Sequence, residues 1–212
     1  MADTPATPAP HPRPAPRRAW QRMLSGRRLD LLDPSALDVE IEDVAHGLSR
    51  VPRWNGQTQG DWAFSVAQHS VLVERIAGLA VVDFAPKWRL AALLHDAPEY
   101  VIGDLISPFK AVVGGDYKRL EARLLAAIHR RAGLPETLPQ HATRTIKRAD
   151  GAAAGFEAVQ LAGFTAAEAA KYFPRPRFRR AIEITLDPLP PAAARDEFLD
   201  RYARLRHACG RD

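Results

Sequence analysis

The chain has 212 residues, and 46% of them are hydrophobic. This composition suffices for one full hydrophobic core, and the length is too short for two domains of ordinary size. Its formal charge is +5, but residues 1–28 hold six arginines against one aspartate, so the remaining chain is neutral and we expect no nucleic-acid partner. The single cysteine, Cys209, excludes an internal disulfide and a cysteine-based zinc site, which fits a reducing cytosol. No apolar run approaches the roughly 18 to 20 residues of a transmembrane helix, so we expect a cytoplasmic protein and no membrane.

Residues 1–26 are rich in proline, alanine and arginine, with six prolines before position 20. Such a segment cannot bury enough apolar surface to offset the entropy lost on ordering. We therefore predict a disordered tail over residues 1–26 and one domain over residues 27–212.

Helical spacing of apolar residues dominates the rest of the chain, and no stretch alternates like a strand for long enough to build a sheet. Residues 53–61, which contain Asn55-Gly56 and Gly60, are predicted to form a loop of the kind that displays binding residues. The fold class is therefore all-α, a single non-bundle domain with candidate ligands from at least three helices. The predicted helices span residues 38–49, 64–80, 87–97, 115–132, 138–162, 165–172 and 191–207.

The pair His95-Asp96 stands in an otherwise apolar segment, Leu93-Leu94-His95-Asp96-Ala97-Pro98-Glu99. An ionised carboxylate removed from water needs a cation or a metal beside it. Pro98 lacks a backbone N–H, so the 87–97 helix should kink or end beside this pair.

Two other segments can converge on the pair. His69 shares a helical face with Val66, Val73 and Ile76, so its ring should point inward. Asp150 precedes the small residues 151–155, which would let its helix approach another closely. Two imidazoles and two carboxylates without a thiolate suit one divalent transition metal ion, Co, Mn, Zn, Ni or Fe.

Four motifs then resemble one family. They are Ser-Val-Ala-Gln-His-Ser at 65–70, His-Asp-Ala-Pro-Glu at 95–99, Gly-Asp-Leu-Ile-Ser-Pro-Phe-Lys at 103–110 and Lys-Arg-Ala-Asp at 147–150. Over about residues 40–165 the chain resembles the 5′-deoxynucleotidase branch of the HD-domain metal-dependent phosphohydrolases. The resemblance implies three sets of site residues: the metal ligands His69, His95, Asp96 and Asp150; the catalytic carboxylates Glu99 and Asp104; and the substrate-binding pair Arg53 and Trp54.

The expected function is therefore removal of phosphate from deoxynucleoside 5′-monophosphates by a metal-dependent phosphohydrolase. Glu99 and Asp104 share the acid and base roles in an order that the sequence leaves open. The same centre acting on nucleoside triphosphates or another phosphorylated metabolite is an alternative, and so is a catalytically idle nucleotide sensor.

The expected partner is a small nucleotide substrate, and a homodimer is compatible with the sequence. No Walker-type phosphate loop is present, which argues against a kinase or a nucleotide-driven motor.

Overall fold

A short antiparallel hairpin precedes the helices. The computed structural model describes residues 19–105, 115–173 and 183–210. Strand β1 (Trp20–Arg22) pairs with β2 (Arg28–Asp30), with Trp20 opposite Asp30. The predicted tail ended at residue 26, but within the described residues the ordered chain already includes β1. The rest of the predicted tail, residues 1–18, lies outside the described residues.

The remaining described residues form an all-α single domain, as the sequence predicted. The predicted ranges 64–80, 115–132, 138–162, 165–172 and 191–207 agree with the observed helices to within two residues at each end. The helices are α1 (Ile41–Leu48), α2 (Val66–Ala80), α3 (Pro86–Leu93), α4 (Glu99–Ile102), α6 (Gly115–Arg131), α7 (Gln140–Gln160), α8 (Ala166–Tyr172) and α9 (Pro191–Cys209), with short 3-10 turns at η1 (Ala36–Asp38) and η2 (Arg53–Gly56).

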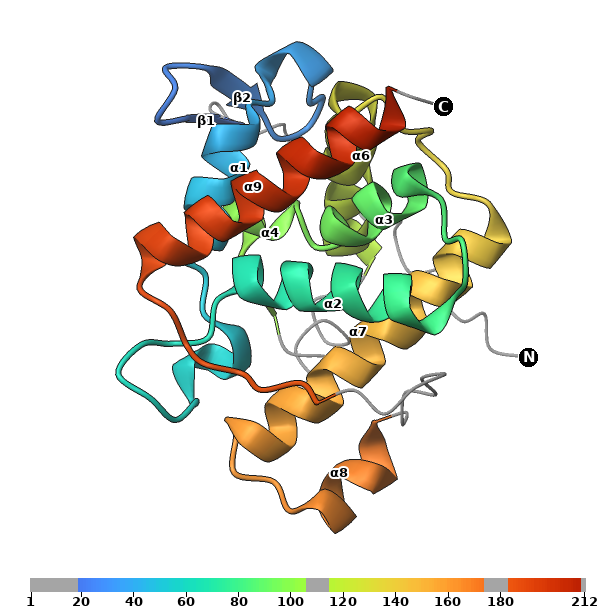
Figure 1. The fold of residues 1–212 in the computed structure, drawn as a ribbon. Helices are drawn as coiled ribbons and strands as arrows, with labels where there is room; N and C mark the ends of the chain where they lie inside the picture. Colours follow the sequence, from blue (N-terminus) through green and yellow to red (C-terminus); the bar gives the residue numbers. More distant parts are fainter. Residues whose placement is uncertain (1–18, 106–114, 174–182, 211–212) are drawn as a thin grey trace, which may run out of the picture.

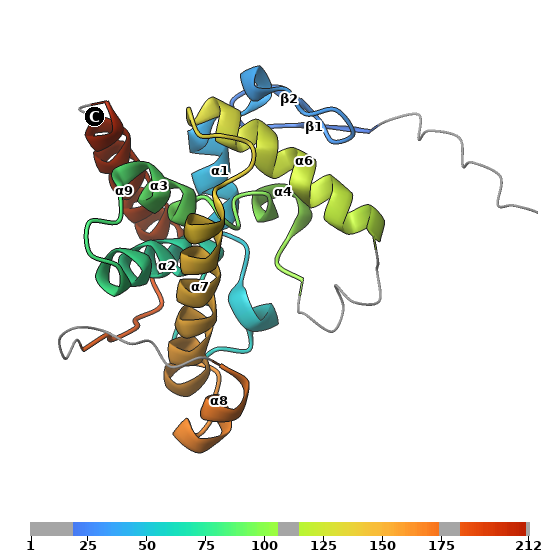
Figure 2. The same ribbon diagram turned by 90° about the vertical axis from the view of Figure 1, so that its right-hand side faces the viewer.

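Helix α2 is the centre of the fold. The hydroxyl of Ser65 caps its start by accepting from the Gln68 backbone N–H, and residues 66–74 are all buried. A helix buried on nearly every side must pack against several others, and α2 contacts α3, α7 and α9. Figures 1 and 2 show α7 crossing α2, with the hairpin and α8 at opposite ends of the molecule.

Helix α3 ends at Leu93, four residues before the predicted end of the 87–97 helix. Residues 94–98 form a turn, and α4 begins directly after Pro98. The expected break beside His95-Asp96 is therefore confirmed, and it begins earlier than the proline itself. The helix predicted over residues 38–49 begins later, at Ile41, because Val39 and Glu40 are extended and separate α1 from η1.

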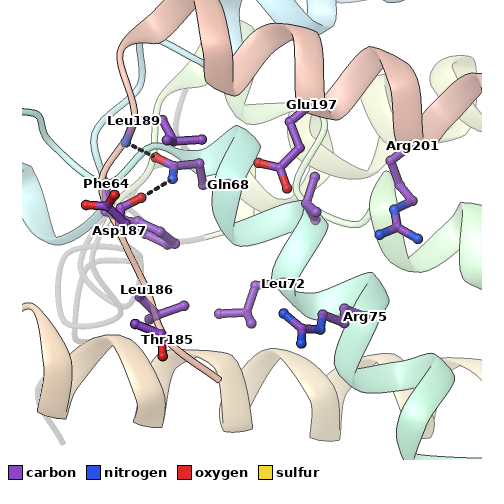
Figure 3. A pocket seen from close by; sticks show the side chains of 11 residues that line it. Phe64, Gln68, Leu72, Arg75, Thr185, Leu186, Asp187, Leu189, Glu197 and Arg201 are labelled. Atoms are coloured by element: carbon purple, nitrogen blue, oxygen red, sulfur yellow. Dashed lines mark hydrogen bonds between the residues drawn. The ribbon is translucent and has the colours of Figure 1, made fainter. Parts of the chain in front are cut away.

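The extended residues 183–190 lead into α9 and lie along α2. Both polar atoms of the Gln68 side-chain amide bind the backbone of this segment. The nitrogen donates to the Asp187 carbonyl at 2.8 Å, and the oxygen accepts from the Leu189 N–H at 3.2 Å (Figure 3). A pocket of about 350 Å³ lies beside this contact, between α2, the segment and α9. Arg75, Arg201 and Glu197 line it, and none of the predicted site residues does.

Candidate metal centre

His69 enters the centre from the first turn of α2. Its face of the helix carries Val66, Val73 and Ile76, which are all buried, and the imidazole is itself fully buried. The inward orientation predicted for His69 is confirmed. Because α2 packs on α7, the ring of His69 faces the helix that carries Asp150.

His95 and Asp96 stand in the turn that follows α3. Tight backbone hydrogen bonds order this turn, from Ala97 N–H to the Leu94 carbonyl at 3.0 Å and from Glu99 N–H to the Asp96 carbonyl at 3.0 Å. The turn directs both side chains of the pair toward His69, and the two imidazole centroids lie 5.3 Å apart. The candidate ligands thus come from α2, from the turn after α3 and from α7.

The ligand atoms of these residues converge on one point. Asp96 Oδ2 lies 3.5 Å from His69 Nε2 and 3.2 Å from His95 Nε2. Asp150 Oδ1 lies 3.3 Å and 4.0 Å from the same two nitrogens. Two ligands bound at about 2.1 Å to one ion lie about 3 to 3.5 Å apart at ordinary coordination angles. His69, His95 and Asp150 have ligand atoms that all fall within 4.8 Å of one another, so this group could hold a metal ion.

The hydrogen bonds of the two imidazoles fit metal binding. His95 Nδ1 contacts the Ala92 carbonyl oxygen at 2.9 Å and His69 Nδ1 contacts Glu157 Oε1 at 2.5 Å. These oxygens can only accept, so each Nδ1 carries the proton and each Nε2 of a neutral ring offers a lone pair. Among the described residues, neither buried Nε2 has a hydrogen-bond partner. Two unpaired nitrogens directed at two carboxylates match the donor set of a divalent transition metal.

The charges around the centre also favour a cation. Burial and the charge of Arg53 oppose protonation of His69, but Glu157, Asp150 and Asp96 outweigh them and raise its pKa well above the ordinary value. Burial opposes ionisation of Asp96, yet the two histidines hold its pKa well below the usual range. The pKa of Asp150 is lowered in the same way by the histidines.

The centre is open on one side. The exposed fraction of the side chain rises from 0% for His69 through 12% for His95 and 22% for Asp96 to 42% for Asp150. Water or a small molecule can therefore approach from the Asp150 side while the inner ligands stay enclosed.

Arg53 and Trp54, the predicted substrate-binding pair, lie in the 3-10 turn η2 beside the centre. The Arg53 guanidinium donates to Asp104 Oδ2 at 2.8 Å and to Glu157 Oε2 at 3.2 Å. The Trp54 indole N–H donates to Glu157 Oε2 at 2.9 Å, and its ring lies against Phe164 and Phe173. The loop predicted over residues 53–61 thus begins with one ordered turn, η2.

The two predicted catalytic carboxylates lie near this arginine. Glu99 begins α4 and is 1% exposed, and Asp104 follows Gly103 in the turn after α4. Burial opposes the charge of Arg53, but Glu157, Asp104, Asp96 and Glu99 together raise its pKa above the ordinary value. The structure therefore brings the predicted metal ligands, catalytic carboxylates and substrate pair into one region. The 103–110 motif extends to residue 110, and its part from residue 106 lies outside the described residues.

Glu157 is a site residue that the sequence reasoning missed. It is fully buried on α7 and accepts hydrogen bonds from His69, Arg53 and Trp54. Burial alone would raise its pKa, but the charges of His69 and Arg53 lower the pKa to about 2. A signal was present, because Glu157 follows Asp150 by seven residues and so lies on the same helical face.

Comparison with known proteins gives relatives whose names state no activity. No family model matches the chain. An uncharacterized protein of Rhodobacter capsulatus is 57% identical over 180 residues, which cover 84% of this chain and 92% of the relative. The uncharacterized protein YfdR of Escherichia coli is 37% identical over 101 residues, 48% of this chain and 51% of the relative. In the part of the chain that the structure describes, no helix has the length and apolar character to span a membrane. Identity and coverage of this extent show that the chain belongs to the same family as the Rhodobacter capsulatus protein.

Proposed function

We propose that this protein is a metal-dependent phosphohydrolase that removes phosphate from deoxynucleoside 5′-monophosphates. The observation that carries the proposal is the convergence of two unpaired imidazole nitrogens and two carboxylates, beside an arginine held between two further carboxylates. The motif resemblance to the 5′-deoxynucleotidase branch of HD-domain enzymes supports the same function.

His69, His95, Asp96 and Asp150 would hold the ion, which is Co, Mn, Zn, Ni or Fe by the chemistry of this donor set. When bound, such an ion lowers the pKa of a coordinated water and polarises a phosphoryl oxygen. The exposed Asp150 side leaves a path for the substrate. Arg53 would offset the negative charge of the phosphate, since its guanidinium lies beside the ligands and is already held in place by Glu157 and Asp104.

Glu99 and Asp104 are the candidates for proton transfer to the leaving oxygen. Glu99 is enclosed near Arg53, whereas Asp104 accepts a hydrogen bond from Arg53 at 2.8 Å. This contact gives Asp104 a second role, which is to orient the guanidinium toward the phosphate.

Trp54 supports the preference for a deoxyribose. Its ring is fixed by the bond to Glu157 and by contacts with two phenylalanines, so it can exclude a 2′-hydroxyl by shape. Discrimination of this kind is worth about 1 to 3 kcal/mol, or roughly 10 to 200-fold in rate. Trp54→Ala is therefore expected to improve the rate on ribonucleotides and so to narrow the difference in rate between deoxyribonucleotides and ribonucleotides.

Phosphate release tests the proposal. The purified protein is stripped of metal, loaded separately with each of the five ions, and assayed on deoxyribonucleoside and ribonucleoside mono- and triphosphates. We expect phosphate from deoxynucleoside monophosphates only in the loaded protein, and none from Asp96→Asn. Release of tripolyphosphate from triphosphates would replace the proposed substrate with the alternative one. Absence of turnover with every ion and nucleotide would contradict the enzymatic proposal.

A further inference from the structure

One buried carboxylate joins the two halves of the candidate site. Glu157 Oε1 contacts His69 Nδ1 at 2.5 Å, and Glu157 Oε2 accepts from Arg53 Nε at 3.2 Å and from Trp54 Nε1 at 2.9 Å. All three donors come from segments more than 80 positions away in the chain, in α2 and η2. The carboxylate is fully buried, so water does not compete for these bonds.

We propose that Glu157 is a positioning residue that sets His69 in the metal-binding tautomer and at the same time fixes the Arg53–Trp54 turn beside the metal centre. The part that concerns Arg53 and Trp54 as substrate contacts rests on the proposed function. The part that concerns His69 depends only on metal binding.

The His69 half follows from the chemistry of the acceptor. An ionised carboxylate oxygen has no proton to give, so Nδ1 of His69 carries a proton, and the neutral ring that binds a metal then presents its lone pair at Nε2. Nε2 is the atom that lies 3.3 Å from Asp150 Oδ1 and 3.5 Å from Asp96 Oδ2. The opposite tautomer would direct an N–H at the ion and prevent coordination. Carboxylate partners of this kind are typical of histidines that bind metals.

The Arg53–Trp54 half follows from the backbone. Trp54 and Asn55 adopt left-handed conformations, with φ of +55° and +51°. Asparagine accepts this region readily, but a tryptophan in it is strained and must be held by its surroundings. The indole N–H bond to Glu157 and the adjacent Arg53 bond supply that restraint from one carboxylate.

Glutamine at this position cannot satisfy all three donors. Its side-chain oxygen can accept either from His69 or from the Arg53–Trp54 pair, and its NH₂ group would then face the other. If the NH₂ faces His69, the imidazole must accept at Nδ1 and carry its proton on Nε2. If the NH₂ group faces the Arg53–Trp54 pair, it meets two N–H donors and leaves them without an acceptor. The first orientation leaves an acceptor for both donors of the pair, so it is the one we expect in Glu157→Gln. The variant should preserve the shape of the site, break the His69 half, and leave Arg53 and Trp54 with a weaker, neutral acceptor.

The test is a titration of metal-free protein with Co²⁺, in which binding is monitored by calorimetry and by the visible absorption of the ion. We expect Glu157→Gln to weaken Co²⁺ binding about 10 to 100-fold, the usual cost of losing such a partner. The matched control is Glu74→Gln. Glu74 is also a fully buried carboxylate, lies on α2 and accepts from Arg89 at 2.6 Å. The control should lower the free energy of unfolding and leave Co²⁺ affinity unchanged.

Two NMR measurements report on the halves separately. In the Zn²⁺-loaded wild-type protein, a long-range ¹H–¹⁵N spectrum should show the His69 proton on Nδ1. Among the indole N–H signals, the one that disappears in Trp54→Phe should also shift in Glu157→Gln, and the other three should not. The first measurement needs no variant of Glu157, so it tests the His69 tautomer even if Glu157→Gln fails to fold.

Several results would overturn the proposal. Equal Co²⁺ affinity in the wild type and Glu157→Gln would remove the role of Glu157 but leave the metal-dependent function intact. Equal weakening in Glu74→Gln would assign the effect to general destabilisation, and a His69 proton on Nε2 would contradict the tautomer. A wild-type protein that binds no Co²⁺ would overturn both this inference and the proposed function.

Discussion

At the scale of single residues, the candidate centre combines enclosed ligands with one accessible ligand. His69 is fully buried and bonded to Glu157, so its replacement would also disturb the core. Asp150 is different, because 42% of its side chain is exposed and it stands on a long helix with its own backbone hydrogen bonds. Asp150 is therefore the ligand whose removal separates metal binding from folding most cleanly.

Asp150→Asn should lower Co²⁺ affinity by more than about 100-fold, since losing a ligand costs more than losing the partner of a ligand. The free energy of unfolding of the metal-free protein should change by about 1 kcal/mol or less, as for other accessible sites. Calorimetric titration and urea denaturation measure the two quantities. Asp200→Asn, an exposed carboxylate on α9, is the control and should alter neither. Unchanged affinity in Asp150→Asn would remove this residue from the ligand set.

The sequence was sufficient to select His69, His95 and Asp96, because apolar neighbours make these groups conspicuous. Asp150 follows Lys147 and Arg148, and it was selected by the small residues after it and by the family resemblance. It was not sufficient for Glu157, whose three partners come from segments that only the packing of α2, α7 and η2 brings together. Nor did it predict the left-handed backbone of Trp54, because that conformation opposes the local preference of the residue and is imposed by tertiary contacts.

At the scale of elements, α1 and α4 meet without room for a side chain. A Cβ atom built at Gly47 would lie 2.8 Å from Tyr100 Cβ and 2.9 Å from the Tyr100 carbonyl oxygen. Since α4 also carries Glu99, this contact fixes the position of one predicted catalytic carboxylate.

Gly47→Ala should therefore destabilise the protein by about 1 to 3 kcal/mol, the usual cost of overpacking. The sign of the change in the free energy of unfolding is informative, because alanine in a helix interior normally stabilises a protein by about 1 kcal/mol relative to glycine. Thermal and chemical unfolding measure the effect. Gly115→Ala at the start of α6 is the control, where the nearest atom is the flexible end of Arg119, and it should be neutral or stabilising. Stabilisation by Gly47→Ala would show that α1 and α4 do not approach so closely.

Element boundaries were predictable where capping and periodicity agree. Ser65 before α2 and Thr165 before α8 both accept from the third residue of their helices, and both starts were predicted to within two residues. The end of α3 was less predictable. The apolar pattern runs on through Leu94, but residues 94–98 form a turn, and this turn places His95 and Asp96 toward α2 and α7.

At the scale of the whole molecule, Glu40 ties the hairpin end of the chain to the helical body. One of its carboxylate oxygens accepts from Arg27 at 2.7 Å and the other accepts from Arg131 of α6 at 2.8 Å. These hydrogen bonds, that of Arg131 first, lower the pKa of Glu40 below its ordinary value of 4.5.

Glu40→Gln should lower the free energy of unfolding at pH 7 by about 0.5 to 1 kcal/mol, since two partly exposed ion pairs contribute a few tenths of a kcal/mol each. A carboxylate with a lowered pKa stabilises the fold above pH 4.5, and that contribution disappears as the pH falls through the lower, folded-state value. The difference between wild type and variant should therefore vanish at low pH. Urea denaturation at pH 7, 4.5 and 3 measures it, with the exposed Glu42→Gln as control. A difference that grows toward acid would contradict the ion-pair account.

The most direct test of the account is the position of the metal itself. Crystals grown with Mn²⁺ or Co²⁺ should give one strong anomalous peak, and the account predicts it within about 2.0 to 2.3 Å of His69 Nε2, His95 Nε2, Asp96 Oδ2 and Asp150 Oδ1. Data collected on both sides of the absorption edge identify the element. A fully loaded protein whose peak lies away from these four side chains, or crystals with no peak among them, would contradict the central claim.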